Sequence, residues 1–162
     1  MGYLDAGRYR LALDRPLVMG IVNVTPDSFS DGGQHFSAAE AISHGINLVE
    51  HGADLLDIGG ESTRPGADRI EIAEELRRVI PVIRGLADVG VPLSVDTMHA
   101  QVAYEAVLAG AVIVNDVSGG LADERMDEVV AELGVDYVLG HWPKDATGRL
   151  SHSVPDYVDV LD

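Results

Sequence analysis

Five polar side chains stand at the ends of short apolar segments, where a buried polar group needs a functional or a structural reason. These residues lie at or just past the C-terminal ends of the segments: Asn23, Asp57, Asp96, Asn115 and His141. Carboxylates and amides in these positions can ligate a hard cation or pair with the polar edge of a bound molecule. If the apolar segments are neighbouring parallel strands, the five side chains meet at one edge of the sheet.

Asn23 is followed by a long polar loop, residues 25–33, which contains one aromatic residue, Phe29. The loop can be a surface connection built from Asx and Ser turns, but its place after a strand favours a lid over a functional site. The Asn23 amide can hydrogen-bond a neighbouring strand. Alternatively, its oxygen can ligate Mg²⁺, which takes substrate phosphates as further ligands.

A second loop, residues 59–68, reads GGESTRPGAD. Its glycine-rich backbone, the hydroxyl groups of Ser62 and Thr63, and the guanidinium of Arg64 are the groups that bind anions. We therefore predict an anion site that includes Thr63 and Arg64.

Asp96 and Asn115 close two further segments. A buried carboxylate must be paired or hydrogen-bonded, so one interpretation is a structural network of Asp96 with Thr97 or Ser94. In the functional interpretation, a carboxylate that accepts two N–H bonds, beside an amide, matches the edge of an aminopyrimidinone ring.

The elements that position these residues alternate between strands and helices. Apolar runs without a helical period predict buried strands at residues 17–24, 53–58, 91–96, 111–115 and 135–140. Amphipathic patterns predict helices from a capping box at Ser37 and Glu40 to Gly52, through Ile72 to Ile83, and near 99–109 and 123–133. Pro81 leaves the end of the second helix open. A glycine falls just before each of four predicted strands, where the preceding helix needs a C-terminal residue in the left-handed conformation. These glycines are Gly52, Gly90, Gly110 and Gly134.

Alternating strands and helices require a parallel sheet with right-handed crossovers. Functional residues at the end of every strand favour a (β/α)8 TIM barrel over a doubly wound sheet. Five strands and four helices are half of such a barrel, so we expect a longer gene product. A further helix opens at residues 156–162. We interpret residues 1–16, with Tyr9, Leu11 and Leu13 in alternation, as a strand or hairpin that covers the barrel bottom, and residues 17–162 as barrel.

Composition excludes several classes of function. The chain has 162 residues and a formal net charge of −16, so its field repels nucleic acids and anionic membrane surfaces. No apolar run is long enough to cross a membrane and no signal peptide is recognisable, which predicts a cytoplasmic location. None of the six histidines occurs in H-E-x-x-H spacing, so from the sequence we expect no zinc site.

Four stretches together resemble dihydropteroate synthases. They are MGIVNVTPDSFSDGG from position 19, DIGGESTRPGA from 57, SVDT from 94 and VNDVSGG from 114. The resemblance covers the chain from Pro16 onward. It implies a TIM barrel that condenses 6-hydroxymethyl-7,8-dihydropterin diphosphate with 4-aminobenzoate, the step that sulfonamides inhibit, in an enzyme that is a homodimer when full length.

The resemblance also implies roles for individual residues. Asn23 corresponds to the magnesium ligand, and Phe29 to the aromatic residue that encloses aminobenzoate. Thr63 and Arg64 correspond to the loop that contacts diphosphate and aminobenzoate, which makes them the candidate catalytic residues. Asp96 and Asn115 correspond to pterin contacts, and we add Asp57 to the substrate-binding residues.

Two other functions stay open at this point. One is a paralogue or fragment that binds pterin without turnover, because the family's later motifs are absent from this sequence. The other is a corrinoid-dependent pterin methyltransferase domain, which shares the barrel but handles no diphosphate. His141 follows a glycine where the family has methionine; it shapes the pterin pocket or is a structural histidine.

Overall fold

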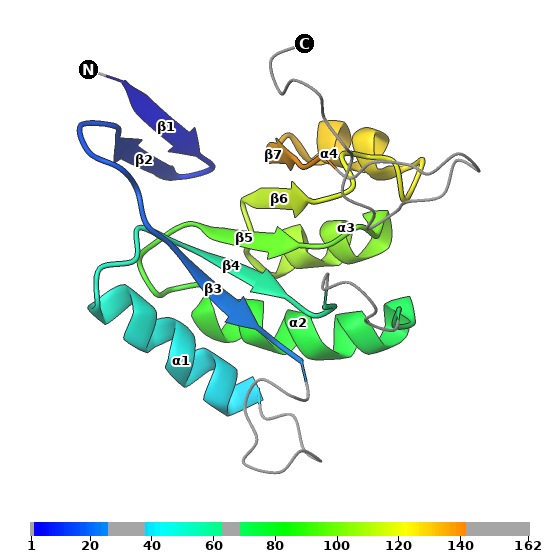
Figure 1. Cartoon of the computed structure of the whole chain (residues 1–162), viewed down its shortest axis with the longest axis horizontal. Coiled ribbons are helices and arrows are strands. Elements are labelled where there is room, and N and C mark those ends of the chain that lie inside the picture. The colour runs from blue at the N-terminus through cyan, green and yellow to red at the C-terminus, as the bar shows by residue number, and fades with distance from the viewer. Residues whose placement is uncertain (1, 26–37, 63–68, 142–162) are drawn as a thin grey trace, which may run out of the picture.

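The computed structural model describes residues 2–25, 38–62 and 69–141. Seven strands lie in this part of the chain: β1 (Tyr3–Ala6), β2 (Tyr9–Ala12), β3 (Met19–Asn23), β4 (Leu55–Gly59), β5 (Leu93–Asp96), β6 (Ile113–Asp116) and β7 (Asp136–Leu139). The helices are α1 (Ala38–Glu50), α2 (Ile72–Leu86), α3 (Ala100–Ala109) and α4 (Met126–Leu133). The order is strand, helix, strand from β3 onward (Figure 1).

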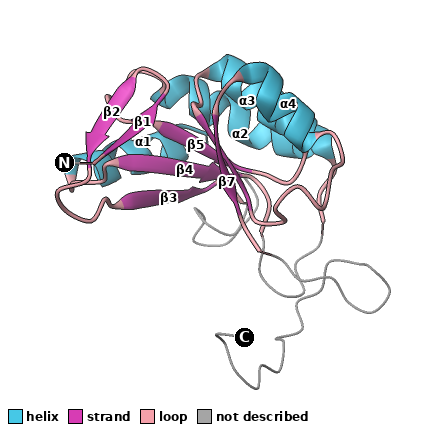
Figure 2. Ribbon diagram, turned by 90° about the horizontal axis from the view of Figure 1, so that it is seen from above, coloured by secondary structure: helices cyan, strands magenta, loops and turns pink. Residues whose placement is uncertain are grey.

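The five strands β3 to β7 form one parallel sheet in the order β3-β4-β5-β6-β7. Each strand pairs with the next one in the sequence, and the four helices lie together on one face of the sheet (Figure 2). A doubly wound sheet reverses its strand order and has helices on both faces. The prediction of a barrel fold, with its first five strands and four helices, is therefore confirmed.

The core lies between the sheet and the helices. Alternate strand residues such as Val22, Leu56, Ile58, Val95 and Val114 are fully or almost fully buried there. The opposite face of the sheet, which we call the inner face, carries the other residues of each strand. Met19 and Ile21 on the inner face of β3 are exposed, as is Val138 on β7, because β3 and β7 are the two edges of the sheet.

The predicted helix ends agree with the structure where it describes them. The four glycines that precede strands all have positive φ values: Gly52, Gly90, Gly110 and Gly134. α2 continues through Pro81 to Leu86, so the proline does not end the helix. Ser37 of the predicted capping box and the predicted helix at 156–162 lie outside the described residues.

The N-terminal segment forms an antiparallel hairpin of β1 and β2. Its buried residue Ala6 packs against Leu55 and Ile113, which lie at the start of β4 and β6. The hairpin therefore covers the inner face at the N-terminal ends of the strands, opposite the edge where their C-terminal residues lie. Within the described ranges, no helix is long and apolar enough to span a membrane.

Close packing of α1 on α2 depends on a glycine in the second helix. A Cβ atom at Gly85 would overlap the side chain of Ile42 on α1. We expect Gly85→Val to lower the free energy of unfolding by about 1 to 3 kcal/mol, because overpacking displaces the helix pair. Urea unfolding measures the change. Gln101→Val on the exposed face of α3 is the control for β-branching alone, and an equal loss in both variants would contradict the packing explanation.

Candidate functional site

Three of the predicted site residues meet on the inner face of the sheet. The parallel register places Asp57 beside Ser94 and Gly59 beside Asp96, and places Asn115 beside Asp96 on the next strand. The Asn115 amide nitrogen donates a 3.0 Å hydrogen bond to Oδ2 of Asp57. We call Asp57, Asp96 and Asn115 the inner-face cluster.

The inner-face cluster keeps unused hydrogen-bonding capacity. Oδ1 of Asp57 and the hydroxyl of Ser94 are buried, and neither makes a hydrogen bond with the described residues. Asp96 has no hydrogen bond to Ser94, and the Thr97 hydroxyl instead accepts the backbone N–H of His99 at 3.1 Å. The network of Asp96 with Thr97 or Ser94 is therefore absent, and the carboxylates remain available to a ligand with N–H groups.

The electrostatics of the cluster set the charge of Asp96. Burial, reinforced by the carboxylates of Asp57, Glu75, Asp116 and Glu61, raises the pKa of Asp96 to about 7. A carboxyl group with this pKa loses its proton close to neutral pH and then becomes an acceptor for two N–H groups.

Burial also raises the pKa of Asp57. Ser94 and Asn115 oppose this rise, although the Ser94 hydroxyl lies outside hydrogen-bonding geometry. Both carboxyl groups of the inner-face cluster are therefore harder to ionise than an exposed aspartate.

Glycine in β4 makes room for the Asp96 side chain. A Cβ atom at Gly59 would lie 3.2 Å from Oδ2 of Asp96 and 3.4 Å from its Cβ. A larger residue at position 59 would therefore crowd the carboxylate from the neighbouring strand.

The other predicted site residues are divided between the described and the undescribed parts of the chain. Asn23 ends β3 beside Gly59, where its side chain is exposed on the inner face. His141 is exposed directly after β7, at the same edge of the sheet. Phe29, Thr63 and Arg64 lie outside the described residues.

Asp116 is a structural centre that the sequence interpretation missed. Its side chain is fully buried. Oδ1 accepts hydrogen bonds from the backbone N–H and hydroxyl of Ser118, at 2.8 and 2.7 Å. Oδ2 accepts from the backbone N–H of Gly120 and the hydroxyl of Tyr137, at 2.8 and 3.0 Å. The signal was present in the stretch VNDVSGG, where an aspartate precedes a serine and two glycines in a turn.

The loop after β4 is held against α2 by a buried arginine. Arg78 donates a 2.9 Å hydrogen bond to the Gly60 carbonyl and pairs with Glu74 at 2.8 Å. Arg77 and Arg78 together lower the pKa of Glu74 to about 2. This anchoring fixes the start of the predicted anion-binding loop and the position of Glu61 within it.

Comparisons with known proteins identify the family. The family model described as "Pterin binding enzyme" matches residues 19–162. The chain is 49% identical over 144 residues to a dihydropteroate synthase of Mycobacterium leprae, which covers 89% of this chain and 50% of that protein.

Solved structures agree with the sequence comparison. A Xanthomonas albilineans dihydropteroate synthase with 4-aminobenzoic acid has a TM-score of 0.81 and 56% identity, over 88% of this chain and 53% of that one. A structure of dihydropteroate synthase from the same organism with 7,8-dihydropteroate has a TM-score of 0.76 and 52% identity, over 88% and 52% of the two chains. The chain thus spans about half the length of the relatives that it matches, and it belongs to the family of pterin binding enzymes.

Proposed function

We propose that the intact protein that carries this chain is a dihydropteroate synthase. It condenses 6-hydroxymethyl-7,8-dihydropterin diphosphate with 4-aminobenzoate and releases diphosphate. The observation that carries the proposal is the inner-face cluster: the buried Asp57, whose Oδ1 has no partner among the described residues, the half-buried Asp96 and the Asn115 amide, at the edge where barrel enzymes bind substrates. The similarity of this chain to a dihydropteroate synthase whose structure contains 7,8-dihydropteroate supports a pterin as the ligand.

Asp96 and Asn115 bind the pterin ring in this proposal. The aminopyrimidinone edge offers N–H donors, for which ionised Asp96 supplies two acceptor oxygens. The Asn115 amide, oriented by its hydrogen bond to Asp57, meets the mixed donor and acceptor positions of the ring. Asp57 holds Asn115 in place and offers its unpartnered Oδ1 to the ligand.

Asn23 is the proposed Mg²⁺ ligand. Its amide oxygen is a hard donor, its side chain is exposed on the inner face, and its backbone is fixed by the pairing of β3 with β4. These features fit a cation that binds through one protein oxygen and substrate phosphates. Bound Mg²⁺ would neutralise charge on the leaving diphosphate.

The proposed reaction is an alkyl transfer. The aminobenzoate nitrogen attacks the pterin methylene carbon, the carbon–oxygen bond breaks, diphosphate leaves with the electron pair, and the amine loses a proton to water. Thr63 and Arg64 stabilise the departing anion, and Phe29 packs on aminobenzoate. An aniline nitrogen is already nucleophilic, so the reaction needs no strong general base.

A diphosphate-release assay on the intact protein tests the proposal. We expect release that requires both aminobenzoate and Mg²⁺. Arg64→Ala should lower kcat/KM by about 100-fold, because one charge-assisted contact to the leaving group is lost. Arg8→Ala on the exposed hairpin is the matched control. Tight pterin binding without any release would instead identify a non-catalytic binder and would overturn the proposal.

The pterin affinity should depend on pH through Asp96. Because the proposed contact needs the ionised carboxylate and the pKa of Asp96 is about 7, affinity should rise by about tenfold from pH 6 to pH 8. Fluorescence titration with a pterin that lacks the diphosphate group measures this without Mg²⁺. An affinity that is flat over this range, or that falls as the pH rises, would contradict the assignment of Asp96.

The proposal also includes a cytoplasmic location and a homodimer for the intact protein. Neither follows from the inner-face cluster. Sedimentation of the intact protein tests the oligomeric state.

A further inference from the structure

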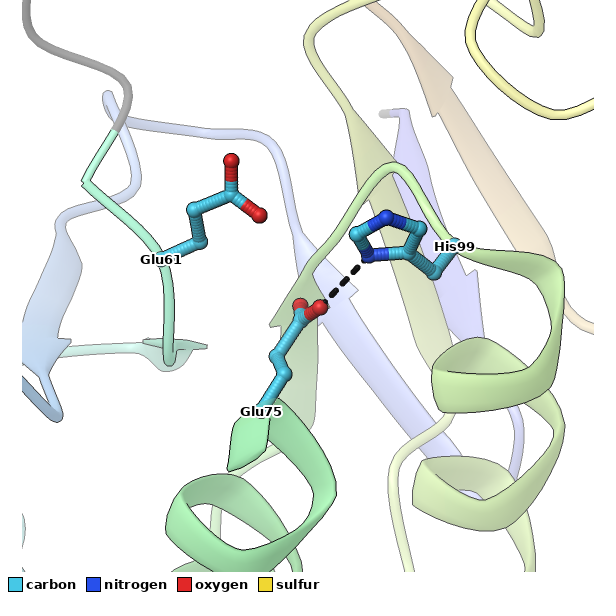
Figure 3. A group of neighbouring side chains, drawn as sticks. All are labelled: Glu61, Glu75 and His99. Carbon is cyan, nitrogen blue, oxygen red and sulfur yellow. Dashed lines mark hydrogen bonds and ion pairs between the residues drawn. The ribbon is translucent and has the colours of Figure 1, made fainter. Parts of the chain in front are cut away.

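A second cluster of ionisable side chains lies outside the inner face. Glu61 is in the loop after β4, Glu75 is in the first turn of α2, and His99 is the residue before α3. Figure 3 shows the two carboxyl groups and the imidazole ring pointing toward one another from these three segments. We call them the Glu61–Glu75–His99 cluster.

The carboxyl groups of this cluster are buried and only partly satisfied. The Glu75 side chain is fully buried and the Glu61 side chain is 6% exposed. Oε2 of Glu61 and Oε1 of Glu75 have no hydrogen-bond partner among the described residues. A buried carboxylate oxygen without a donor costs on the order of 1 to 3 kcal/mol or more, so each of these oxygens is suited to a cation.

The neighbouring cations leave room for another positive charge. Arg69 reaches Oε1 of Glu61 at 3.1 Å, but its side chain is 49% exposed. His99 Nδ1 lies 2.7 Å from Oε2 of Glu75. These contacts engage one oxygen of each carboxyl group and leave the other oxygen of each pair without a partner.

The geometry fits one metal ion after small shifts. One potential ligand atom from each residue lies within 4.8 Å of the other two. Ligand atoms around a tetrahedral ion with bonds of about 2.1 Å are about 3.4 Å apart. Side-chain rotations that move the atoms by about 1 Å would therefore bring all three ligands into bonding range.

We propose that the Glu61–Glu75–His99 cluster binds a divalent transition-metal cation of the Zn²⁺ type. Carboxylate oxygens and imidazole nitrogens are both ligands of such ions, and a site with three protein ligands leaves a fourth position for water. Mg²⁺ prefers an all-oxygen site, so the imidazole separates this site from the one proposed at Asn23. The ligands come from three distant segments, which is why no local histidine spacing reveals the site.

The competing occupant is a proton on His99. The hydrogen bond to Glu75 is the main reason that the pKa of His99 is raised, and an imidazolium ion there would also balance the carboxylates. Metal binding must displace this proton. A metal titration therefore distinguishes the two occupants.

The experiment titrates Zn²⁺ into the intact protein at pH 8 with excess Mg²⁺ present, by calorimetry. We expect one Zn²⁺ per chain. Co²⁺ in place of Zn²⁺ should give the visible absorption of an ion with a nitrogen ligand. Because the readout is metal binding rather than turnover, failure here leaves the proposed synthase function untouched.

Matched variants locate the ion. His99→Gln and Glu61→Gln should each weaken Zn²⁺ binding by at least tenfold, whereas His51→Gln and Glu50→Gln on the exposed end of α1 should not. Circular dichroism confirms that each variant is folded. The proposal would be overturned if the unsubstituted protein bound no stoichiometric Zn²⁺, or if binding survived both cluster variants. Protonated His99 would then be the group that balances the charge of the two carboxylates.

Discussion

Asp116→Ala should lower the free energy of unfolding by on the order of 3 to 5 kcal/mol. The substitution leaves the four donors that now bind the Asp116 carboxylate without their acceptor: two from Ser118, one from Gly120 and one from Tyr137. Asp116 is fully buried, so water cannot replace the lost acceptor without opening the loop. Urea unfolding followed by circular dichroism measures the change.

Asp136→Ala is the matched control for this loss. Asp136 is an exposed aspartate at the start of β7, one strand away from Asp116, and its removal should change stability by less than about 0.5 kcal/mol. Asp116→Asn keeps the size of the side chain but exchanges one acceptor oxygen for a donor, so it should also destabilise the chain. A loss below about 1 kcal/mol for Asp116→Ala would show that the loop does not depend on this carboxylate.

Asp96→Asn should weaken pterin binding and stabilise the fold. The amide offers one acceptor and one donor, so it cannot accept two N–H bonds, and we expect the affinity for a pterin at pH 8 to fall by about 100-fold. The tenfold dependence of affinity on pH should disappear in the same variant. Fluorescence titration at pH 6 and pH 8 measures both effects.

The gain in stability follows from the raised pKa of Asp96. An unfolded aspartate ionises near pH 3.8, whereas folded Asp96 ionises near pH 7. Between these values the folded state binds more protons than the unfolded state, so the contribution of Asp96 to stability falls as the pH rises. Removing the charge should therefore raise the free energy of unfolding at pH 8 by on the order of 2 to 4 kcal/mol.

The same comparison at low pH is the internal check. Below about pH 3 the carboxyl group is protonated in both states, so the advantage of Asp96→Asn that comes from removing the charge should disappear. Asp136→Asn, on the exposed start of β7, should show no gain at pH 8. If Asp96→Asn were less stable than the unsubstituted chain at pH 8, the folded state would stabilise the charge of Asp96, which would contradict the prediction.

Local patterns were sufficient to predict the elements. Apolar runs, amphipathic periods and four glycines predicted all five strands of the parallel sheet and its four helices, with most ends within two or three residues. The end of α2, which Pro81 left open in the sequence, lies at Leu86. A proline prevents one backbone hydrogen bond, and the burial of Val82, Ile83 and Leu86 outweighs that loss.

The candidate site was only partly predictable. Side-chain types at strand ends predicted Asp57, Asp96 and Asn115 because parallel strands bring their C-terminal ends to one edge. Which residues pair there depends on register: Asn115 hydrogen-bonds Asp57, two strands away, rather than Asp96 beside it. Sequence spacing contains no such information, because contacts across strands depend on how the whole sheet curves.

By itself, the sequence determined the order of strands and helices, because that order follows from local periodicity. It also determined which polar residues stand at the strand ends, and the four motif stretches there indicated the family. Only the tertiary structure decided which of those polar groups are buried, which lie unpartnered and how their charges interact. The pKa of Asp96 depends on carboxylates that lie on four other segments, and the Glu61–Glu75–His99 cluster joins three segments. Burial and charge interactions act through space, so they are set when distant segments pack together.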